Sequence, residues 1–189
     1  MKARIAFFIF TLLSATIVGG CQSVKQDTHQ KIDEWIDLAG VGVYWNHIPE
    51  NRRRTGLTSF VLGKNKDGYN SYGGCEPSPW MAYPRSKESI DSPKELFRFA
   101  QELGWGVADC GDDSGRERYR LAHKANKWAL ARWREAGLRL TDQQRADIFC
   151  GIDGELRRYK RQKPGRPVDT DVLDFLKDNP LPSDWKCGR

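Results

Sequence analysis

Apolar and polar positions divide the chain into segments of different character. Residues 5–18 are mostly apolar, and residues 22–30 are mostly polar without a regular period. Residues 41–84 hold short β-prone runs between glycines and prolines, whereas helical periodicity dominates from residue 90 onward. The pattern predicts an α+β, helix-rich fold with two disulfides, in which a small irregular β and loop region precedes about four helices.

Capping signals and turn residues set the limits of the expected elements. Ser92–Glu95 combines an N-cap, a proline at the first helical position and an acidic residue, and Thr141–Gln144 is a capping box. The β-prone runs cover 41–45 and 58–62. The expected helices cover residues 30–38, 92–103, 114–136, 141–163 and 170–177.

The N-terminal residues have the composition of a secretion signal. Lys2 and Arg4 precede an apolar stretch that is short for a membrane-spanning helix. The run from Val18 through Gly19 and Gly20 to Cys21 resembles the lipobox of bacterial lipoproteins, in which the cysteine is acylated and becomes the mature N-terminus. Cleavage that leaves Cys21 as a plain thiol, and an uncleaved anchor, are the alternatives.

The lipobox resemblance implies a domain organisation and a location. It implies a signal peptide over 1–20, a lipid-anchored tether over 21–30 and a single globular domain over 31–189. Palmitate-type chains on Cys21 would anchor the protein at the cell membrane, facing the periplasm. An aspartate in the next position usually retains lipoproteins of Gram-negative bacteria at the inner membrane, so Gln22 favours the outer membrane.

Four further cysteines follow the signal region: Cys75, Cys110, Cys150 and Cys187. An even number of cysteines in an exported chain predicts two disulfide bonds. Zinc is the less favoured alternative, because no pair has CxxC spacing and the histidines are distant. No metal or other cofactor is expected. Of the three possible pairings, Cys75–Cys110 with Cys150–Cys187 closes the shorter loops and is preferred.

Positive charge is concentrated in the second half of the chain. Residues 22–113 carry 11 basic and 14 acidic residues, whereas residues 114–189 carry 18 basic and 11 acidic residues. The helix expected over 114–136 has an apolar, alanine-rich face that includes Ala122, Ala125 and Ala129. Five cations fall on the opposite face: Arg116, Arg120, Lys124, Lys127 and Arg134. This face is either a solvated surface or a contact for an acidic protein or anionic lipids. Nucleic acid is not an expected partner of an exported protein.

A second group of candidate binding residues lies in the aromatic stretch 44–84, which includes Tyr72 and Trp80. Tyrosine and tryptophan are enriched in interface hot spots, but such rings can equally form the core of a disulfide-braced region. The sequence leaves these two interpretations open.

The sequence contains no Gly-x-Ser-x-Gly nucleophile motif, no His-Glu-x-x-His metal motif and no phosphate-binding P-loop motif. Acidic residues such as Glu50, Glu76 and Glu102 could form a carboxylate pair, although any chain of this length offers such pairs. The sequence therefore predicts a non-catalytic envelope protein that binds, inhibits or assists another macromolecule. The alternative is an envelope hydrolase that acts on peptidoglycan or lipid.

Overall fold

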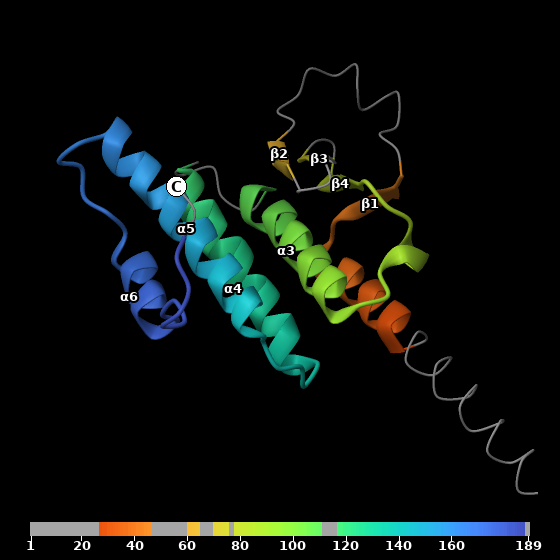
Figure 1. Cartoon of the computed structure of the whole chain (residues 1–189). Coiled ribbons are helices and arrows are strands. Elements are labelled where there is room, and N and C mark those ends of the chain that lie inside the picture. The colour runs from red at the N-terminus through yellow and green to blue at the C-terminus, as the bar shows by residue number, and fades with distance from the viewer. Residues whose placement is uncertain (1–26, 47–59, 65–69, 76–77, 111–116, 188–189) are drawn as a thin grey trace, which may run out of the picture.

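A computed structural model of the chain describes residues 27–46, 60–64, 70–75, 78–110 and 117–187. The fold is α+β and helix-rich, as the sequence predicts (Figure 1). After a helix over residues 27–39, the elements are β1 (Gly42–Trp45), β2 (Phe60–Lys64), β3 (Asn70–Gly74), β4 (Trp80–Tyr83), the 3-10 turn η1 (Lys87–Ser89), α3 (Pro93–Cys110), α4 (Arg118–Glu135), α5 (Asp142–Gln162) and α6 (Thr170–Asp178).

The β region forms one four-stranded sheet with the order β1-β4-β3-β2. Strand β1 pairs with β4 in parallel, and β3 pairs with both β4 and β2 in antiparallel fashion. Every side chain of β4 is buried, because this strand lies inside the sheet and also packs against α3. The small β region that the sequence predicts is thus a four-stranded sheet, with one register shift between β2 and β3 at Val61 and Gly63.

Two helix boundaries differ from the sequence prediction. Residues 27–29, which lie in the segment expected to be a tether, are already helical, and an ion pair between Asp27 and Lys31 links successive turns of this helix. Helix α3 starts at Pro93 as expected but continues to Cys110 rather than ending near Leu103. Its last two turns stay helical because Gly106 and Ala108 are buried against neighbouring elements.

The core lies where α3 and α4 cross. Gly104 on α3 touches the backbone of Ala125 so closely that a Cβ at position 104 would lie 2.4 Å from the carbonyl oxygen of Ala125. The alanine-rich face of α4, which the sequence predicts to be apolar, is the face that is buried here. Small residues on both helices thus permit a close helix–helix approach.

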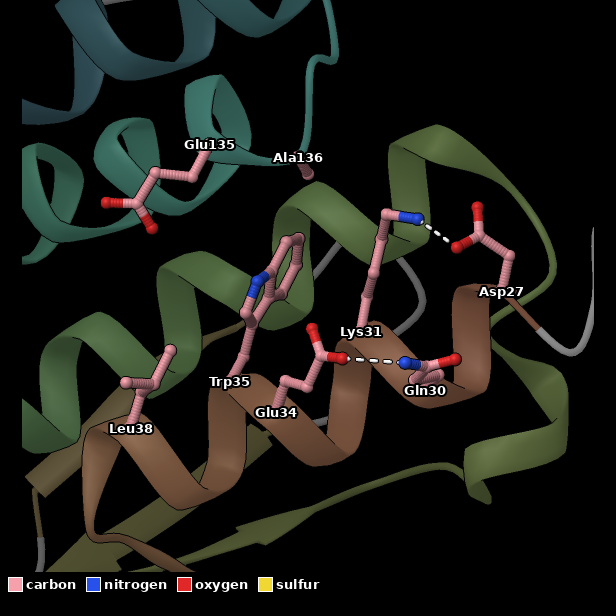
Figure 2. A pocket seen from close by; sticks show the side chains of 8 residues that line it. All are labelled: Asp27, Gln30, Lys31, Glu34, Trp35, Leu38, Glu135 and Ala136. Atoms are coloured by element: carbon pink, nitrogen blue, oxygen red, sulfur yellow. Dashed lines mark hydrogen bonds and ion pairs between the residues drawn. The ribbon is translucent and has the colours of Figure 1, made fainter.

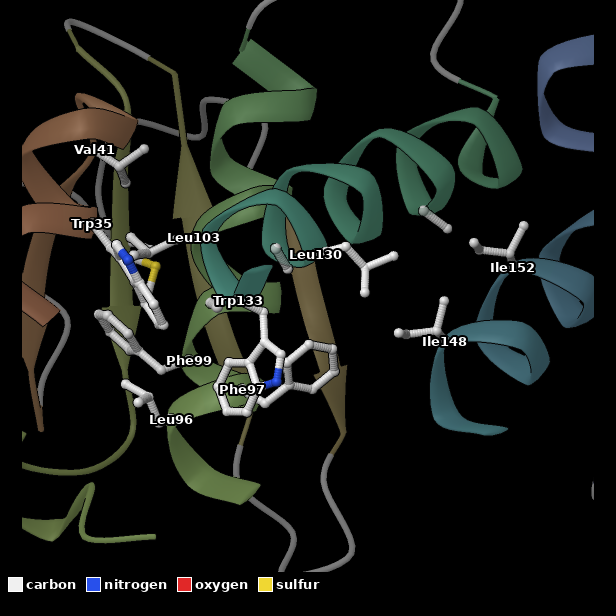
Figure 3. Close-up of a cluster of buried hydrophobic side chains, with 14 of the residues drawn as sticks. Trp35, Val41, Leu96, Phe97, Phe99, Leu103, Leu130, Trp133, Ile148 and Ile152 are labelled. Atoms are coloured by element: carbon white, nitrogen blue, oxygen red, sulfur yellow. The ribbon is translucent and has the colours of Figure 1, made fainter. Parts of the chain in front are cut away.

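Buried apolar side chains, many of them aromatic, connect the helix over 27–39 and α5 to the crossing of α3 and α4 (Figure 3). The ring of Trp133 lies 5.0 Å from that of Phe97 and 6.4 Å from that of Trp35, between centroids. Trp133 is 1% exposed, and Ile148 and Ile152 bring α5 into the same cluster. The helix over 27–39 is therefore an integral part of the core.

Two disulfide bonds brace the fold, with the pairing that closes the shorter loops. Cys75 pairs with Cys110, which links the end of β3 to the end of α3, and their Cα atoms are 5.2 Å apart. Cys150 pairs with Cys187, which fastens the C-terminal segment to α5. Among the described helices, none combines the length and apolar composition that crossing a bilayer requires.

Candidate functional site

The cations expected on one face of α4 do not form a continuous free surface. Arg120 lies 3.3 Å from Glu117 and 3.4 Å from Asp169 in ion pairs, and it also contacts the ring of Tyr119. Arg116 lies outside the described residues. Arg120 therefore helps to hold the start of α6 against α4.

Helix α6 interrupts the same face. The ring of His123 is buried on α4 and lies 4.9 Å from the ring of Phe175 on α6. This burial, together with the charge of Lys127, lowers the pKa of His123. Lys124, Lys127 and Arg134 are exposed on α4.

The more exposed cationic surface is the last turns of α5 and the loop after it. We define this basic end by its six exposed cations: Arg157, Arg158, Lys160, Arg161, Lys163 and Arg166. Three of them form ion pairs with acids nearby, such as Arg157 with Asp153 at 2.8 Å. Among the described residues, no ion pair involves Lys160, Arg161 or Arg166. The basic end and the helix over 27–39 lie at opposite ends of the molecule (Figure 1).

The aromatic residues of the sheet are largely interior. Trp80 is 5% exposed and Tyr83 is 2% exposed, because β4 is buried on both faces. A Cβ on Gly74 would lie 2.7 Å from Nε1 of Trp80, so that ring fills the space beside the strand. Of the two interpretations that the sequence leaves open for Trp80, its burial favours the one in which the ring belongs to the core. Tyr72 pairs with Ala82 in the sheet, but its side chain lies outside the described part of the chain.

A buried acid on α3 is the most unusual polar group in the described core. Glu102 is 7% exposed, and its Oε2 atom has no hydrogen-bond partner. Burial raises the pKa of Glu102 to about 8, and only Arg98 opposes this shift. Burial, and then the charge of Glu102, also raise the pKa of the neighbouring Tyr83.

Glu95 lies two turns before Glu102 on the same helix and has an ion pair with Arg85 at 3.3 Å. In the sequence analysis Glu102 is one acid among several. Its position among the buried apolar residues of α3 is the pattern that distinguishes it from the others. Glu50 and Glu76 lie outside the described residues. A carboxyl group that holds its proton near neutral pH can donate that proton to a bound group.

A groove of about 350 Å³ lies between the helix over 27–39 and the end of α4 (Figure 2). In Figure 2, Trp35 and Lys31 project from the first helix toward Glu135 and Ala136 of α4 and the turn after it. The residues that line the groove are Asp27, Gln30, Lys31, Glu34, Trp35, Leu38, Glu135 and Ala136. No sequence pattern predicts this groove, because the groove forms only where two helices that are distant in the sequence pack together.

Within the described part of the chain, no group of three or more histidine, cysteine, aspartate or glutamate side chains is placed to hold a metal ion. Comparison with known proteins found no match: neither a protein family, nor a curated protein, nor a solved structure resembles this chain.

Proposed function

We propose that this chain is an exported, lipid-anchored protein of the bacterial cell envelope that binds an acidic protein partner through the basic end of α5. Export is supported by the signal-like N-terminal residues that lead into Cys21, and by disulfide bonds that suit an oxidising compartment. The observation that carries the binding proposal is the cluster of exposed cations at the basic end.

The position of the basic end favours a partner away from the anchoring membrane. Asp27, the first described residue of the helix, lies six residues after Cys21, so a lipid there would lie at most about 21 Å from it along the chain. The basic end lies at the opposite end of the molecule (Figure 1). Headgroups of the anchoring membrane are therefore poorly placed to be its ligand.

The local mixture of charges favours a protein over a polyanion. Asp153, Glu155 and Glu117 lie among the cations of the basic end and pair with some of them. These carboxylates would repel a uniformly anionic polymer, whereas an acidic protein surface can place basic groups opposite them.

The test is affinity capture from envelope extracts with the full lipoprotein. We expect one stoichiometric partner, lost when Lys160, Arg161 and Arg166 are changed to Glu. The matched control changes three exposed cations elsewhere to Glu: Lys94, Arg139 and Arg145. Retention of the partner by both variants, or its loss from both, would refute the basic end as the binding site. Flotation of the lipid-free protein with anionic vesicles, if abolished only by the first variant, would point to lipid instead.

A second candidate function, hydrolysis of an envelope polymer, is favoured by one observation. Glu102 is buried with no hydrogen-bond partner for its Oε2 atom, and this burial raises its pKa to about 8, a range that suits a general acid. Release of soluble fragments from peptidoglycan by the wild-type protein, lost in Glu102→Gln and kept in Glu88→Gln, would support it. Glu88 is a suitable control because it lies in η1, away from the core. Equal release by both variants would rule out Glu102 as the acid.

A further inference from the structure

We propose that the groove between the helix over 27–39 and the end of α4 binds a small aliphatic amine, meaning an ammonium group on an apolar stem. This inference concerns a different surface from the basic end and does not depend on the proposed function.

The lining of the groove includes an apolar residue that no other described residue covers. Leu38 is 61% exposed there, and it is one of only two large hydrophobic residues exposed among the described residues. The indole of Trp35 forms the adjacent wall, and Ala136 closes the groove from the α4 side (Figure 2). An aliphatic stem placed here would remove apolar area of Leu38 from water.

The charges around the groove favour a cation. Its lining contains three carboxylates and a single basic side chain, that of Lys31. Lys31 pairs with Asp27, and Glu135 pairs with Arg132. Glu34 differs from the other two carboxylates, because among the described residues it accepts a hydrogen bond from the neutral amide of Gln30, at 2.9 Å.

Glu34 is therefore the carboxylate in the groove that an incoming ammonium group can neutralise. An anion would be repelled by the excess of negative charge in the groove. An uncharged alkane would displace water from the surface beside Glu34 without supplying a counter-charge for its carboxylate. An ammonium group on a short stem satisfies both parts of the groove, since the stem covers Leu38 while the head reaches Glu34.

The size of the groove favours a free small molecule. Its volume of about 350 Å³ is at the lower end of the range for small-ligand sites, roughly 300–1,000 Å³. A groove of this size holds a short chain with one head group.

The test uses hexylammonium as the probe and hexanoate, which has the same number of carbons and the opposite charge, as its control. The mature lipid-free chain is titrated by NMR, with the Trp35 indole and Leu38 methyl signals as readouts. We expect saturable shifts with hexylammonium and none with hexanoate. Glu34→Gln should weaken binding about fivefold, as the loss of a partly exposed ion pair predicts. Leu38→Ala should weaken it about threefold through lost apolar contact.

Asp37→Asn provides the matched control, because Asp37 is an exposed carboxylate on the same helix that does not line the groove. Its affinity for hexylammonium should equal that of the wild-type chain. Three results would each overturn the proposal: equal binding of hexanoate, unchanged affinity in Glu34→Gln, or equal weakening in Asp37→Asn. A response to a lysine-rich peptide but not to hexylammonium would also overturn it, and would assign the groove to a partner protein. Unchanged amide spectra away from the groove verify that each variant is folded.

Discussion

Glu102 illustrates how a single residue can couple the stability of this fold to pH. Its pKa is raised to about 8 in the folded chain, whereas an unfolded glutamate titrates near ~4.3. Between these two values the folded state binds more protons than the unfolded state. Stability therefore falls as pH rises through this window, and the loss is complete above the folded pKa.

This coupling predicts the behaviour of Glu102→Gln. The amide cannot ionise, so we expect the variant to be more stable than the wild-type chain at pH 8. The difference should shrink as the pH is lowered toward 5, at a rate of at most about 1.4 kcal/mol per pH unit. Urea denaturation at several pH values measures it. A difference that stays constant across this range would show that Glu102 does not titrate as its burial implies.

Some residue-level features could be read from the sequence, and others could not. The capping box of Thr141 and Gln144 was predictable, because its signal lies within four consecutive residues, and both of its hydrogen bonds are present. The burial of Glu102 and His123 was not predictable in the same way. Each depends on an element that is distant in the chain, β4 in the first case and α6 in the second.

At the scale of elements, the crossing of α3 and α4 depends on one glycine. We expect Gly104→Ala to destabilise the fold by about 1–3 kcal/mol, because the added methyl group collides with the backbone of Ala125, which cannot rotate away. Denaturant titration of the folded chain measures the change.

Gly151→Ala is the matched control for this prediction. Gly151 lies inside α5 with nothing within 4 Å of a Cβ at that position, so alanine should stabilise the helix by about 0.5–1 kcal/mol. If both variants were destabilised equally, an effect common to the two substitutions would explain the result, and the close crossing would not.

The two faces of α4 differ in how far the sequence predicts their surroundings. The pattern of α4 correctly predicts its buried alanine face, because a period of 3.6 residues is a property of the segment itself. The opposite face, rich in cations, gave no sign that α6 would pack against His123. Whether a polar helix face is solvated depends on elements that fold onto it, and these are not encoded within the segment.

At the scale of the whole molecule, the sequence predicted the class of fold and the number of disulfides. The choice among the three cysteine pairings required the three-dimensional structure, since loop length gave only a preference. The groove at Leu38 and the opposite placement of the basic end also emerge only when all the helices are assembled.

The proposed anchoring can be tested on the intact protein in bacterial cells. Cys21→Ser should leave a precursor-sized chain that incorporates no labelled palmitate, because the thiol that accepts the lipid is absent. Adding Ser23→Cys to this variant should not restore labelling, because that cysteine lacks the lipobox position. Continued labelling of Cys21→Ser would disprove lipidation at this residue.

The packing of the first helix has a mechanical consequence. Ile32 is fully buried and Trp35 lies against Trp133, so only residues 22–26 separate the core from the proposed lipid. Suppose that a partner held at the basic end moves relative to the membrane. The tension would then reach the helical core through the contact between the Trp35 and Trp133 rings. With the proposed lipid and the proposed partner in place, the folded chain would transmit force from one to the other.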